Sequence, residues 1–305
     1  MLHRILVTLF AFQTVASAQL SKFQARTQKG QTSGLNLGYR LFTPAGYDKA
    51  KKYPLVIALH GSGERGNNNT AQITANQLAN IWTEDSLQNR VPHFVMAPQC
   101  PGESTWVQYN KPLAGRPLSG SLKIVLEIVD SLAREFNLDA DRVYCVGLSM
   151  GGFATWELAQ RYPDKFAAIV PICGWADTSK AALIKALPTW AFHGGSDPTV
   201  PVAGSRDMIA ALRAAGGSPK YTEYPGVGHE SWVPALKEKE LSPWLFAQKR
   251  TSATGLSQKA PADWSPAGRI PGHYPWQGQP HALDGRQLPA TGISLPDLPE
   301  GNASP

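Results

Sequence analysis

The sequence lacks several features that would assign it to well-known classes of protein. Its three cysteines, Cys100, Cys145 and Cys173, have no spacing typical of a metal site, and an odd number leaves at least one thiol unpaired. The apolar run near the N-terminus, Ile5 to Phe12, is too short to anchor the chain across a bilayer. The net charge of +6 is scattered and not gathered into runs, so nothing indicates nucleic-acid binding.

The composition divides the 305 residues into three parts. Residues 1–18 combine a basic residue, the short apolar run and the small-residue site Ala16-Ser17-Ala18, as in a secretory signal peptide. We therefore expect a secreted or periplasmic protein, with an uncleaved N-terminal anchor as the alternative. Residues 19–250 hold the periodic apolar segments. Residues 251–305 are rich in proline and glycine without such a period, which predicts a disordered tail, or alternatively a small binding module.

Segments typical of strands and helices alternate along residues 19–250. Tyr53 to Leu59 is a nearly continuous apolar run, as expected of a central strand covered on both faces. This alternation predicts an α/β fold with a mostly parallel central sheet and helices on both faces. The other expected strands are a pair between Phe23 and Phe42, His93–Ala97, Arg142–Val146, Phe166–Cys173, Thr189–His193 and Tyr221–Tyr224; the expected helices lie at Ala75–Trp82, Ser119–Phe136, Gly152–Tyr162, Val202–Ala215 and Leu241–Gln248.

The most informative motif lies in the segment Asp141 to Trp156, DRVYCVGLSMGGFATW. Its first half is typical of a buried strand and its second half of a helix, which predicts Ser149 on the turn between them. Gly147 and Gly151 flank the serine where a side chain would collide with a neighbouring element. Gly-x-Ser-x-Gly in this context predicts a nucleophile elbow, and it places the Met150 N–H at a helix N-terminus, where it favours a developing oxyanion. A glycine-flanked structural turn is the alternative.

A second loop, His60 to Gly66, follows the predicted strand that ends at Leu59. Its glycines let the backbone approach a substrate oxygen closely, so we expect the backbone N–H of Ser62 as a second oxyanion donor, with Gly61 as the alternative. The Lys-Ser/Thr ending of a phosphate-binding loop is missing. We expect the histidine of this loop to be structural and Glu64 and Arg65 to form an ion pair.

Two side chains complete a candidate catalytic set with Ser149. His229 follows the last predicted strand in a glycine-rich loop, and Asp197 follows the strand before it. Both therefore lie where an open α/β sheet places its ligand crevice. A serine hydroxyl needs a positioned base and the base needs an orienting carboxylate, so we expect His229 as base and Asp197 as acid. Asp177 is the alternative acid, and Glu230 is expected to point away from the serine.

The motifs LHGSGERG, APQCP, VGLSMGG, HGGSDPTVP and GVGHESW together resemble the α/β-hydrolase superfamily. Within it, residues 20–250 are similar to the secreted carboxylesterases and peptidases related to prolyl oligopeptidase and dienelactone hydrolase. The resemblance implies Ser149 as nucleophile, Asp197 as acid and His229 as base. Dienelactone hydrolases proper use a cysteine nucleophile, so the serine indicates the esterase branch. The tail after Arg250 has no counterpart in the family pattern.

This reading predicts ester hydrolysis through an acyl-enzyme, with no metal or cofactor required. The short connection after Cys173 leaves no room for a cap domain, so we expect an open cleft edged by Trp106, Trp175 and Trp232, although core positions are the alternative for these rings. Such a cleft suits an ester on a feruloylated or acetylated polysaccharide. A serine peptidase, a polyester depolymerase and a non-catalytic binding protein on the same scaffold are the alternatives. The oligomeric state stays open.

The cysteines have separate expected roles. Cys145 and Cys173 lie in apolar runs and are expected to be small core residues, whereas Cys100, which follows a strand, is either free or bridged.

Overall fold

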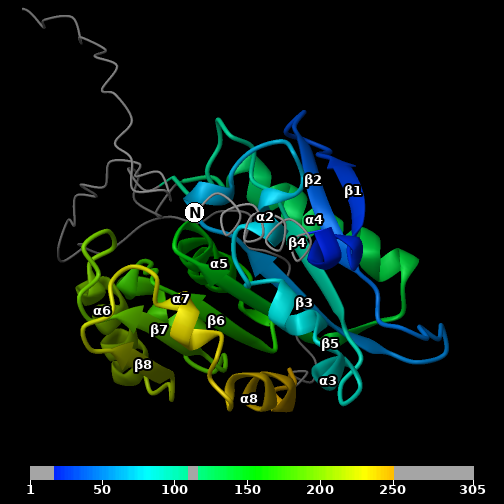
Figure 1. The fold of residues 1–305 in the computed structure, drawn as a ribbon. Helices are drawn as coiled ribbons and strands as arrows, with labels where there is room; N and C mark the ends of the chain where they lie inside the picture. Colours follow the sequence, from blue (N-terminus) through cyan, green and yellow to red (C-terminus); the bar gives the residue numbers. More distant parts are fainter. Residues whose placement is uncertain (1–16, 109–115, 251–305) are drawn as a thin grey trace, which may run out of the picture.

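The computed structural model describes residues 17–108 and 116–250 (Figure 1). These residues contain one mixed sheet, whose strands are β1 (Gln24–Lys29), β2 (Asn36–Phe42), β3 (Tyr53–Leu59), β4 (Phe94–Pro98), β5 (Leu138–Leu148), β6 (Ala168–Ile172), β7 (Trp190–Gly194) and β8 (Lys220–Tyr224). The strand order is β1-β2-β4-β3-β5-β6-β7-β8. β2 pairs antiparallel with β1 and β4, and every other pair is parallel. The predicted α/β fold with a mostly parallel sheet is confirmed.

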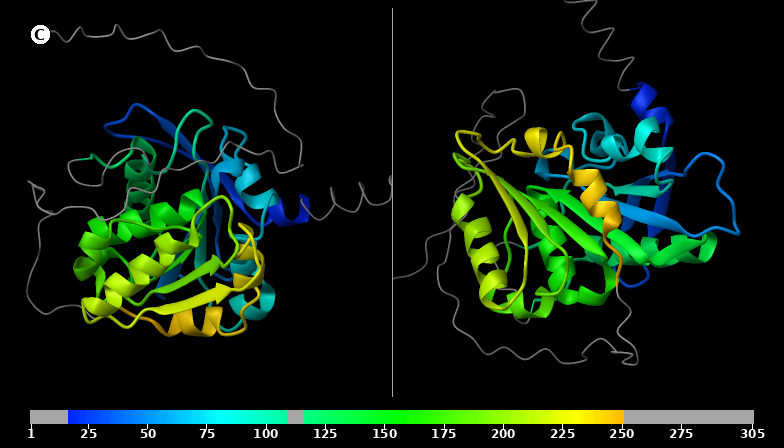
Figure 2. Two further views of the ribbon diagram at one scale, coloured as in Figure 1. Left: turned by 90° about the vertical axis from the view of Figure 1, so that its left-hand side faces the viewer. Right: turned by 90° about the horizontal axis from the view of Figure 1, so that it is seen from below.

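Helices cover both faces of the sheet (Figure 2). One face packs against α4 (Gly120–Glu135), α5 (Met150–Arg161), α6 (Val202–Ala214) and the 3₁₀ helix η4 (Thr178–Ile184). The other packs against α2 (Ala71–Thr74), η2 (Asn80–Thr83), α3 (Asp85–Gln88), α7 (Trp232–Ala235) and α8 (Leu241–Ala247). Short 3₁₀ turns also occur at η1 (Ser62–Glu64) and η3 (Pro163–Lys165).

The central strand β3 contributes to both layers of the core. Leu55 and Ile57 pack in the layer with α4 and α5, whereas Val56 and Ala58 pack in the layer with α7 and α8. Successive side chains of a strand point to opposite faces, so a strand covered on both sides must be apolar throughout. This explains why the continuous apolar run predicted these strand bounds correctly.

One predicted helix is wrong. Residues 75–82 do not form a helix: α2 ends at Thr74 and η2 begins at Asn80. The side chain of Asn76 accepts a hydrogen bond from the Leu78 N–H at 2.9 Å, and the Asn80 amide donates to the Ile73 carbonyl at 2.7 Å. Asparagine side chains that bond to nearby backbone groups compete with helical hydrogen bonds, which accounts for the break.

Several predictions on the chain ends and the cysteines can be compared with the structure. The predicted signal peptide, apart from its last two residues, and the predicted tail at 251–305 lie outside the described residues. Among the described residues, no helix is long and apolar enough to cross a membrane. All three cysteines are buried and free, so Cys100 is not bridged. Between β6 and β7 only η4 is present, and no cap domain is inserted there.

The turn from β5 to α5 holds Ser149 in an unusual conformation. Its φ is 52° and its ψ is −117°, a region that residues with a side chain rarely adopt. The Ser149 N–H donates to the Ile172 carbonyl at 2.9 Å, and the Ser149 carbonyl accepts the first bond of the helix from Phe153 at 3.1 Å. Bonds to a strand on one side and a helix on the other therefore fix the strained residue.

The two glycines that flank this turn have no space for a side chain. A Cβ added to Gly147 would lie 2.1 Å from the Gly151 carbonyl oxygen, and one added to Gly151 would lie 1.8 Å from the Leu59 carbonyl oxygen. Both contacts are with backbone atoms, which cannot rotate away. The glycines thus allow α5 to start directly against β3 and β5.

We predict that Gly151→Ala lowers the free energy of unfolding by about 3 kcal/mol or more, because overpacking against fixed backbone costs at least as much as overpacking in a side-chain core. Gly228→Ala is the matched control, since a Cβ there would meet its nearest atom only at 4.0 Å. Urea unfolding of both variants measures the difference. Equal stability of the two would contradict the close approach at the turn.

Two histidines are buried beside the strand ends. His60 follows β3 and His93 precedes β4, and both are at most 1% exposed. His60 Nδ1 donates to the Gly61 carbonyl at 2.6 Å while its Nε2 accepts from the Cys100 N–H at 2.9 Å, a pattern that requires the neutral ring. Burial lowers the pKa of each histidine to about 4.

These histidines make the stability depend on pH. Their folded pKa lies below the unfolded value near 6.5, so the unfolded chain binds more protons between the two values. The free energy of unfolding is therefore highest above pH 6.5 and falls as the pH drops toward 4. We expect each histidine to account for a loss of ~2 kcal/mol between pH 7 and pH 5. Urea unfolding at both pH values should show a smaller loss in His93→Gln, and an equal loss would refute the assignment.

Candidate active site

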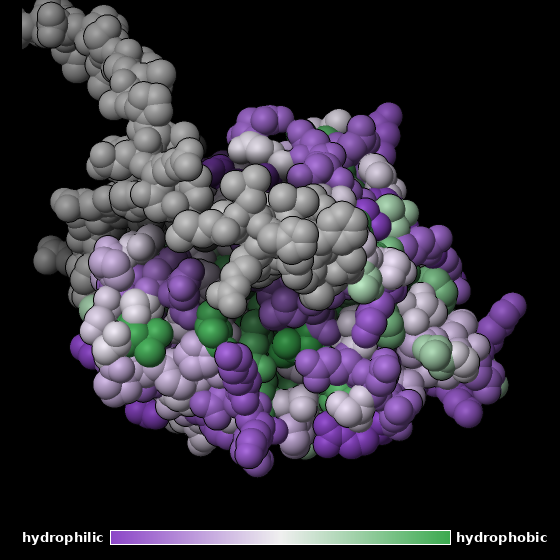
Figure 3. All heavy atoms as spheres, viewed as in Figure 1, coloured by the Kyte–Doolittle hydropathy of each residue, from purple (hydrophilic) through white to green (hydrophobic). Residues whose placement is uncertain are grey.

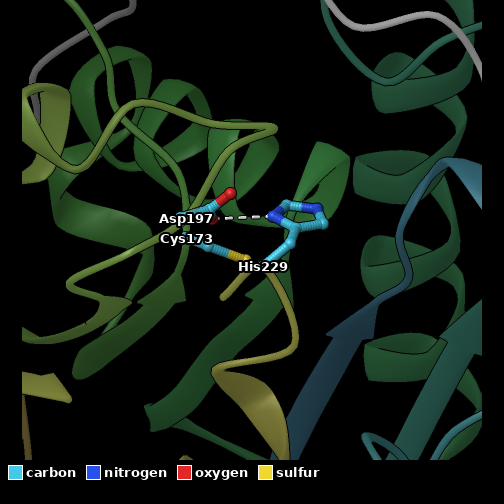
Figure 4. A group of neighbouring side chains, drawn as sticks. All are labelled: Cys173, Asp197 and His229. Atoms are coloured by element: carbon cyan, nitrogen blue, oxygen red, sulfur yellow. Dashed lines mark hydrogen bonds and ion pairs between the residues drawn. The ribbon is translucent and has the colours of Figure 1, made fainter. Parts of the chain in front are cut away.

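The structure brings together three polar side chains that are far apart in the sequence. Ser149 follows β5, Asp197 follows β7 and His229 follows β8. His229 Nε2 lies 2.9 Å from Ser149 Oγ, and His229 Nδ1 lies 2.8 Å from Asp197 Oδ2 (Figure 4 shows the second pair). A hydrogen-bonded chain thus runs from the carboxylate through the imidazole to the hydroxyl, with the geometry that a base-activated serine requires.

Asp197 is held by four donors. Its Oδ1 accepts the backbone N–H groups of Thr199 at 2.8 Å and Val200 at 2.9 Å. Its Oδ2 lies 2.8 Å from His229 Nδ1 and 3.3 Å from His193 Nε2. Burial alone would raise the pKa of Asp197, but the hydrogen bonds from His193, His229 and the loop backbone outweigh it and hold the pKa well below its usual range. The buried side chain is therefore ionised at neutral pH.

Sequence reasoning gave no role to His193, although it lies at the end of β7, four residues before Asp197 in the segment HGGSD. The four-residue spacing is visible in the sequence, but the contact between the two side chains depends on the path of the loop after β7, which the sequence does not show.

The alternative acid, Asp177, lies elsewhere: its carboxylate accepts from the Ser179 N–H at 3.0 Å and caps η4. Glu230 is exposed, as its expected orientation away from the serine requires.

Two backbone segments lie beside Ser149. Met150 is the first residue of α5, so no helical carbonyl is available to its N–H. The loop after β3 also approaches closely, since a Cβ on Gly61 would lie 3.6 Å from Ser149 Cβ. His60 fixes the Gly61 carbonyl, and Ser62, the next residue, begins η1. The two predicted oxyanion donors, Ser62 and Met150, thus belong to segments that flank Ser149.

Glu64 and Arg65 do not form the expected ion pair. Arg65 donates to the backbone carbonyls of Ser62 at 3.0 Å and Ser104 at 3.3 Å. Glu64 is buried, with its carboxylate 3.8 Å from His60 Nδ1, and burial raises the pKa of its carboxyl group. The arginine braces the loop through backbone oxygens because the glutamate turns inward, beneath the loop.

Trp106 does not edge the cleft as expected. Its side chain is fully buried, its Nε1 donates to the His60 carbonyl at 3.1 Å, and its ring lies 5.2 Å from the His60 ring. The indole supports the loop after β3 from beneath, because a buried tryptophan needs an acceptor for its N–H and the His60 carbonyl is within reach.

The two other tryptophans are half-buried. Trp232 packs edge to face on the His229 ring, with centroids 5.3 Å apart. Trp175 packs against Phe153 with centroids 5.4 Å apart. Figure 3 shows hydrophobic residues gathered near the middle of the face presented in Figure 1, with polar residues around them. Trp232 is thus an aromatic side chain in direct contact with the candidate catalytic histidine.

Cys173, Asp197 and His229 bring a thiol, a carboxylate and an imidazole within 4.8 Å of one another (Figure 4). These residues do not suit a metal ion. Burial, assisted by the negative charge of Asp197, raises the pKa of the Cys173 thiol, whereas a metal ligand must be the thiolate. The imidazole is already hydrogen-bonded to the carboxylate through Nδ1 and to the serine hydroxyl through Nε2.

Comparisons of this chain with a family model, with solved structures and with curated proteins all point to esterases and depolymerases. The family model "Esterase PHB depolymerase" matches residues 37–220. A solved structure described as a thermostable esterase shares 40% identity at a TM-score of 0.74, covering 76% of this chain and 64% of that one. Poly(3-hydroxyalkanoate) depolymerase C of Paucimonas lemoignei is 30% identical over 174 residues, 54% of this chain and 38% of its own length.

A further relative is "Probable feruloyl esterase C" of Aspergillus terreus, 24% identical over 213 residues, which are 68% of this chain and 73% of that protein. The chain spans less than half of the Paucimonas lemoignei depolymerase and about two thirds of the esterase structure. The family match covers more than half of this chain and includes β2 to β7 with the turn at Ser149. The chain therefore belongs to the Esterase PHB depolymerase family, within the α/β-hydrolase superfamily.

Proposed function

We propose that this chain is a serine esterase that hydrolyses carboxylic esters through an acyl-enzyme on Ser149. The observation that carries the proposal is the hydrogen-bonded chain from Asp197 through His229 to the serine hydroxyl. The family match and the names of the esterase relatives support ester hydrolysis. The fold itself hosts many reactions, so the proposal rests on the site.

The proposed mechanism follows from the proton positions. Asp197 is a carboxylate and can only accept, so the Nδ1 of His229 carries a proton and its Nε2 offers a lone pair to Ser149 Oγ. Ser149 attacks the acyl carbonyl while His229 takes its proton, and the same histidine then protonates the departing alcohol. Water, activated by His229, releases the acid and restores the serine.

Charge that develops on the substrate oxygen needs donors fixed in advance. We assign this role to the backbone N–H groups of Met150 and Ser62, the first supported by the N-terminal end of α5. The His60 ring holds the Gly61 carbonyl, and the Ser62 N–H belongs to the same planar peptide and points to the opposite side. The loop after β3 can therefore present this N–H without rearranging during the reaction.

For the substrate we propose an ester of an aromatic or acetyl group on a polysaccharide, met outside the cytoplasm. The absence of a cap between β6 and β7 supports a site open to a large substrate, and Trp232 beside His229 supports an aromatic group. The feruloyl esterase relative and the predicted signal peptide agree with this choice. A polyester is the second candidate, supported by the family match and by the Paucimonas lemoignei depolymerase.

We predict that Ser149→Ala lowers kcat by ~10⁴ to 10⁶-fold on any substrate the enzyme turns over, because it removes the nucleophile and leaves binding intact. Initial rates on methyl ferulate, p-nitrophenyl acetate and a poly(3-hydroxybutyrate) film, with this variant as the blank, test the substrate class. Preference for the ferulate supports the polysaccharide ester, and turnover of the film supports the polyester. No serine-dependent turnover of any of the three would refute the esterase proposal.

The oxyanion assignment gives a second prediction. Ser62→Pro removes the backbone N–H, and proline suits this position because Ser62 is the first residue of η1 and follows the extended Gly61. We expect kcat to fall ~10² to 10³-fold, the cost of one lost oxyanion donor. Ser62→Ala keeps the N–H and should leave kcat nearly unchanged. Measurement of kcat for both variants on the same ester tests the assignment, and equal kcat in the two would exclude Ser62 as a donor.

A further inference from the structure

We propose that Arg65 is a positioning residue of this site: its guanidinium holds the Ser62 carbonyl and thereby sets the direction of the Ser62 N–H, the assigned oxyanion donor. The inference deepens the proposed function and rests on it for the role of that N–H. Its starting point is an arginine in the loop after β3 whose side chain donates to two backbone carbonyls.

Ser62 lies between two peptide groups, and a side chain holds each of them. The Gly61 carbonyl, in the peptide before Ser62, accepts from His60 Nδ1 at 2.6 Å. The Ser62 carbonyl, in the peptide after it, accepts from Arg65 Nε at 3.0 Å and from the Arg65 backbone N–H at 3.4 Å. A residue has only two soft backbone dihedrals, so holding the peptide plane on each side fixes both. The direction of the Ser62 N–H thus depends on His60 and Arg65 together.

The guanidinium also joins this loop to the loop after β4. Arg65 Nη1 donates to the Ser104 carbonyl at 3.3 Å. The same two loops are joined by the bond from Trp106 Nε1 to the His60 carbonyl at 3.1 Å. The buried indole holds the first residue of the loop after β3, whereas the half-buried arginine holds the part that carries the donor. Arg65 therefore connects the backbone at Ser62 to a second loop of the protein.

Arginine suits this task better than lysine. The guanidinium is planar with donors at fixed angles, so one side chain can bond to two carbonyls at once, whereas an ammonium group on a flexible stem defines the geometry less well. The neighbouring glutamate leaves these bonds undisturbed. Glu64 is buried with its carboxylate 3.8 Å from His60 Nδ1, so it does not draw the guanidinium away from the Ser62 and Ser104 carbonyls.

The expected effect follows from the geometry that an oxyanion donor needs. A donor stabilises the transition state only when it points at the developing charge, and a misplacement of ~1 Å can cost ~10²-fold in rate. Arg65→Ala keeps the Ser62 N–H but frees one of the two peptide groups that orient it. We therefore expect kcat to fall by ~10 to 100-fold and KM to change by less than ~3-fold, because the orientation matters in the transition state.

The matched control is Arg90→Ala. Arg90 Nε also donates to a backbone carbonyl, that of Ser86 at 3.1 Å. This arginine precedes β4 and therefore lies at the opposite edge of the sheet from the loop after β3, since β3 and β4 are parallel. Arg90→Ala should leave kcat unchanged. Arg65→Lys keeps the charge without the planar fork, so its kcat should lie between those of Arg65→Ala and the wild type. Unchanged kcat in Arg65→Ala would overturn the proposal.

A double-mutant cycle tests whether Arg65 acts through the Ser62 N–H. Ser62→Pro removes this N–H, so in that background no donor is left for Arg65 to orient. We expect Arg65→Ala to lower kcat by less than ~3-fold in the Ser62→Pro protein, against ~10-fold or more in the wild type, because the two changes remove the same interaction. Equal losses in the two backgrounds would show that Arg65 does not act through this N–H and would overturn the proposal.

A measurement that needs no activity separates this inference from the proposed function. In ¹⁵N relaxation the order parameter of the Ser62 N–H should be about 0.85 in the wild type and in Arg90→Ala, and should fall toward ~0.6 in Arg65→Ala. An unchanged order parameter in Arg65→Ala would overturn the role of Arg65 in holding the loop. Absence of serine-dependent turnover in the wild-type protein would instead overturn the proposed function and leave that role to the relaxation result.

Discussion

The left-handed conformation of Ser149 is the constraint on which the rest of the structure depends. A residue with φ of 52° is held there only because a strand and a helix fix both of its peptide bonds. Those bonds require β6 alongside and α5 packed directly on β3, which in turn requires glycine at positions 147 and 151. The backbone strain at Ser149 is thus offset by the close packing of α5 against β3, β5 and β6.

The polar side-chain atoms of His60, His193 and Asp197, which are buried at the site, all have hydrogen-bond or ion-pair partners. The carboxylate of Asp197 accepts from four donors, and both nitrogens of His60 and of His193 have partners. In a low-dielectric interior each unpaired group would be costly, and each paired group loses its freedom to move. The network therefore holds the His229 ring, through its contact with Asp197, in the direction that the proposed reaction requires.

Sequence patterns predicted what depends on local periodicity and motif order. The apolar strands were predicted correctly because burial on both faces requires a continuous apolar run. The turn at Ser149 was predicted correctly because close backbone contact requires glycine on each side of it. The break after Thr74 was missed because side-chain bonds of asparagine compete with the helix. The burial of Trp106 and the contact of His193 with Asp197 were not predicted. Both depend on the path of a loop in space, which no local sequence pattern determines.

The spread of the site along the chain has a consequence for how the protein assembles. Its parts follow β3, β5, β7 and β8, strands joined by parallel pairing between segments distant in sequence. Contacts of this kind require long loops to close, which slows folding. A partly folded chain can bury β3 and β5 yet still lack both the carboxylate and the imidazole. The proposed activity therefore depends on the pairing of β7 and β8 with the sheet as much as on the turn at Ser149.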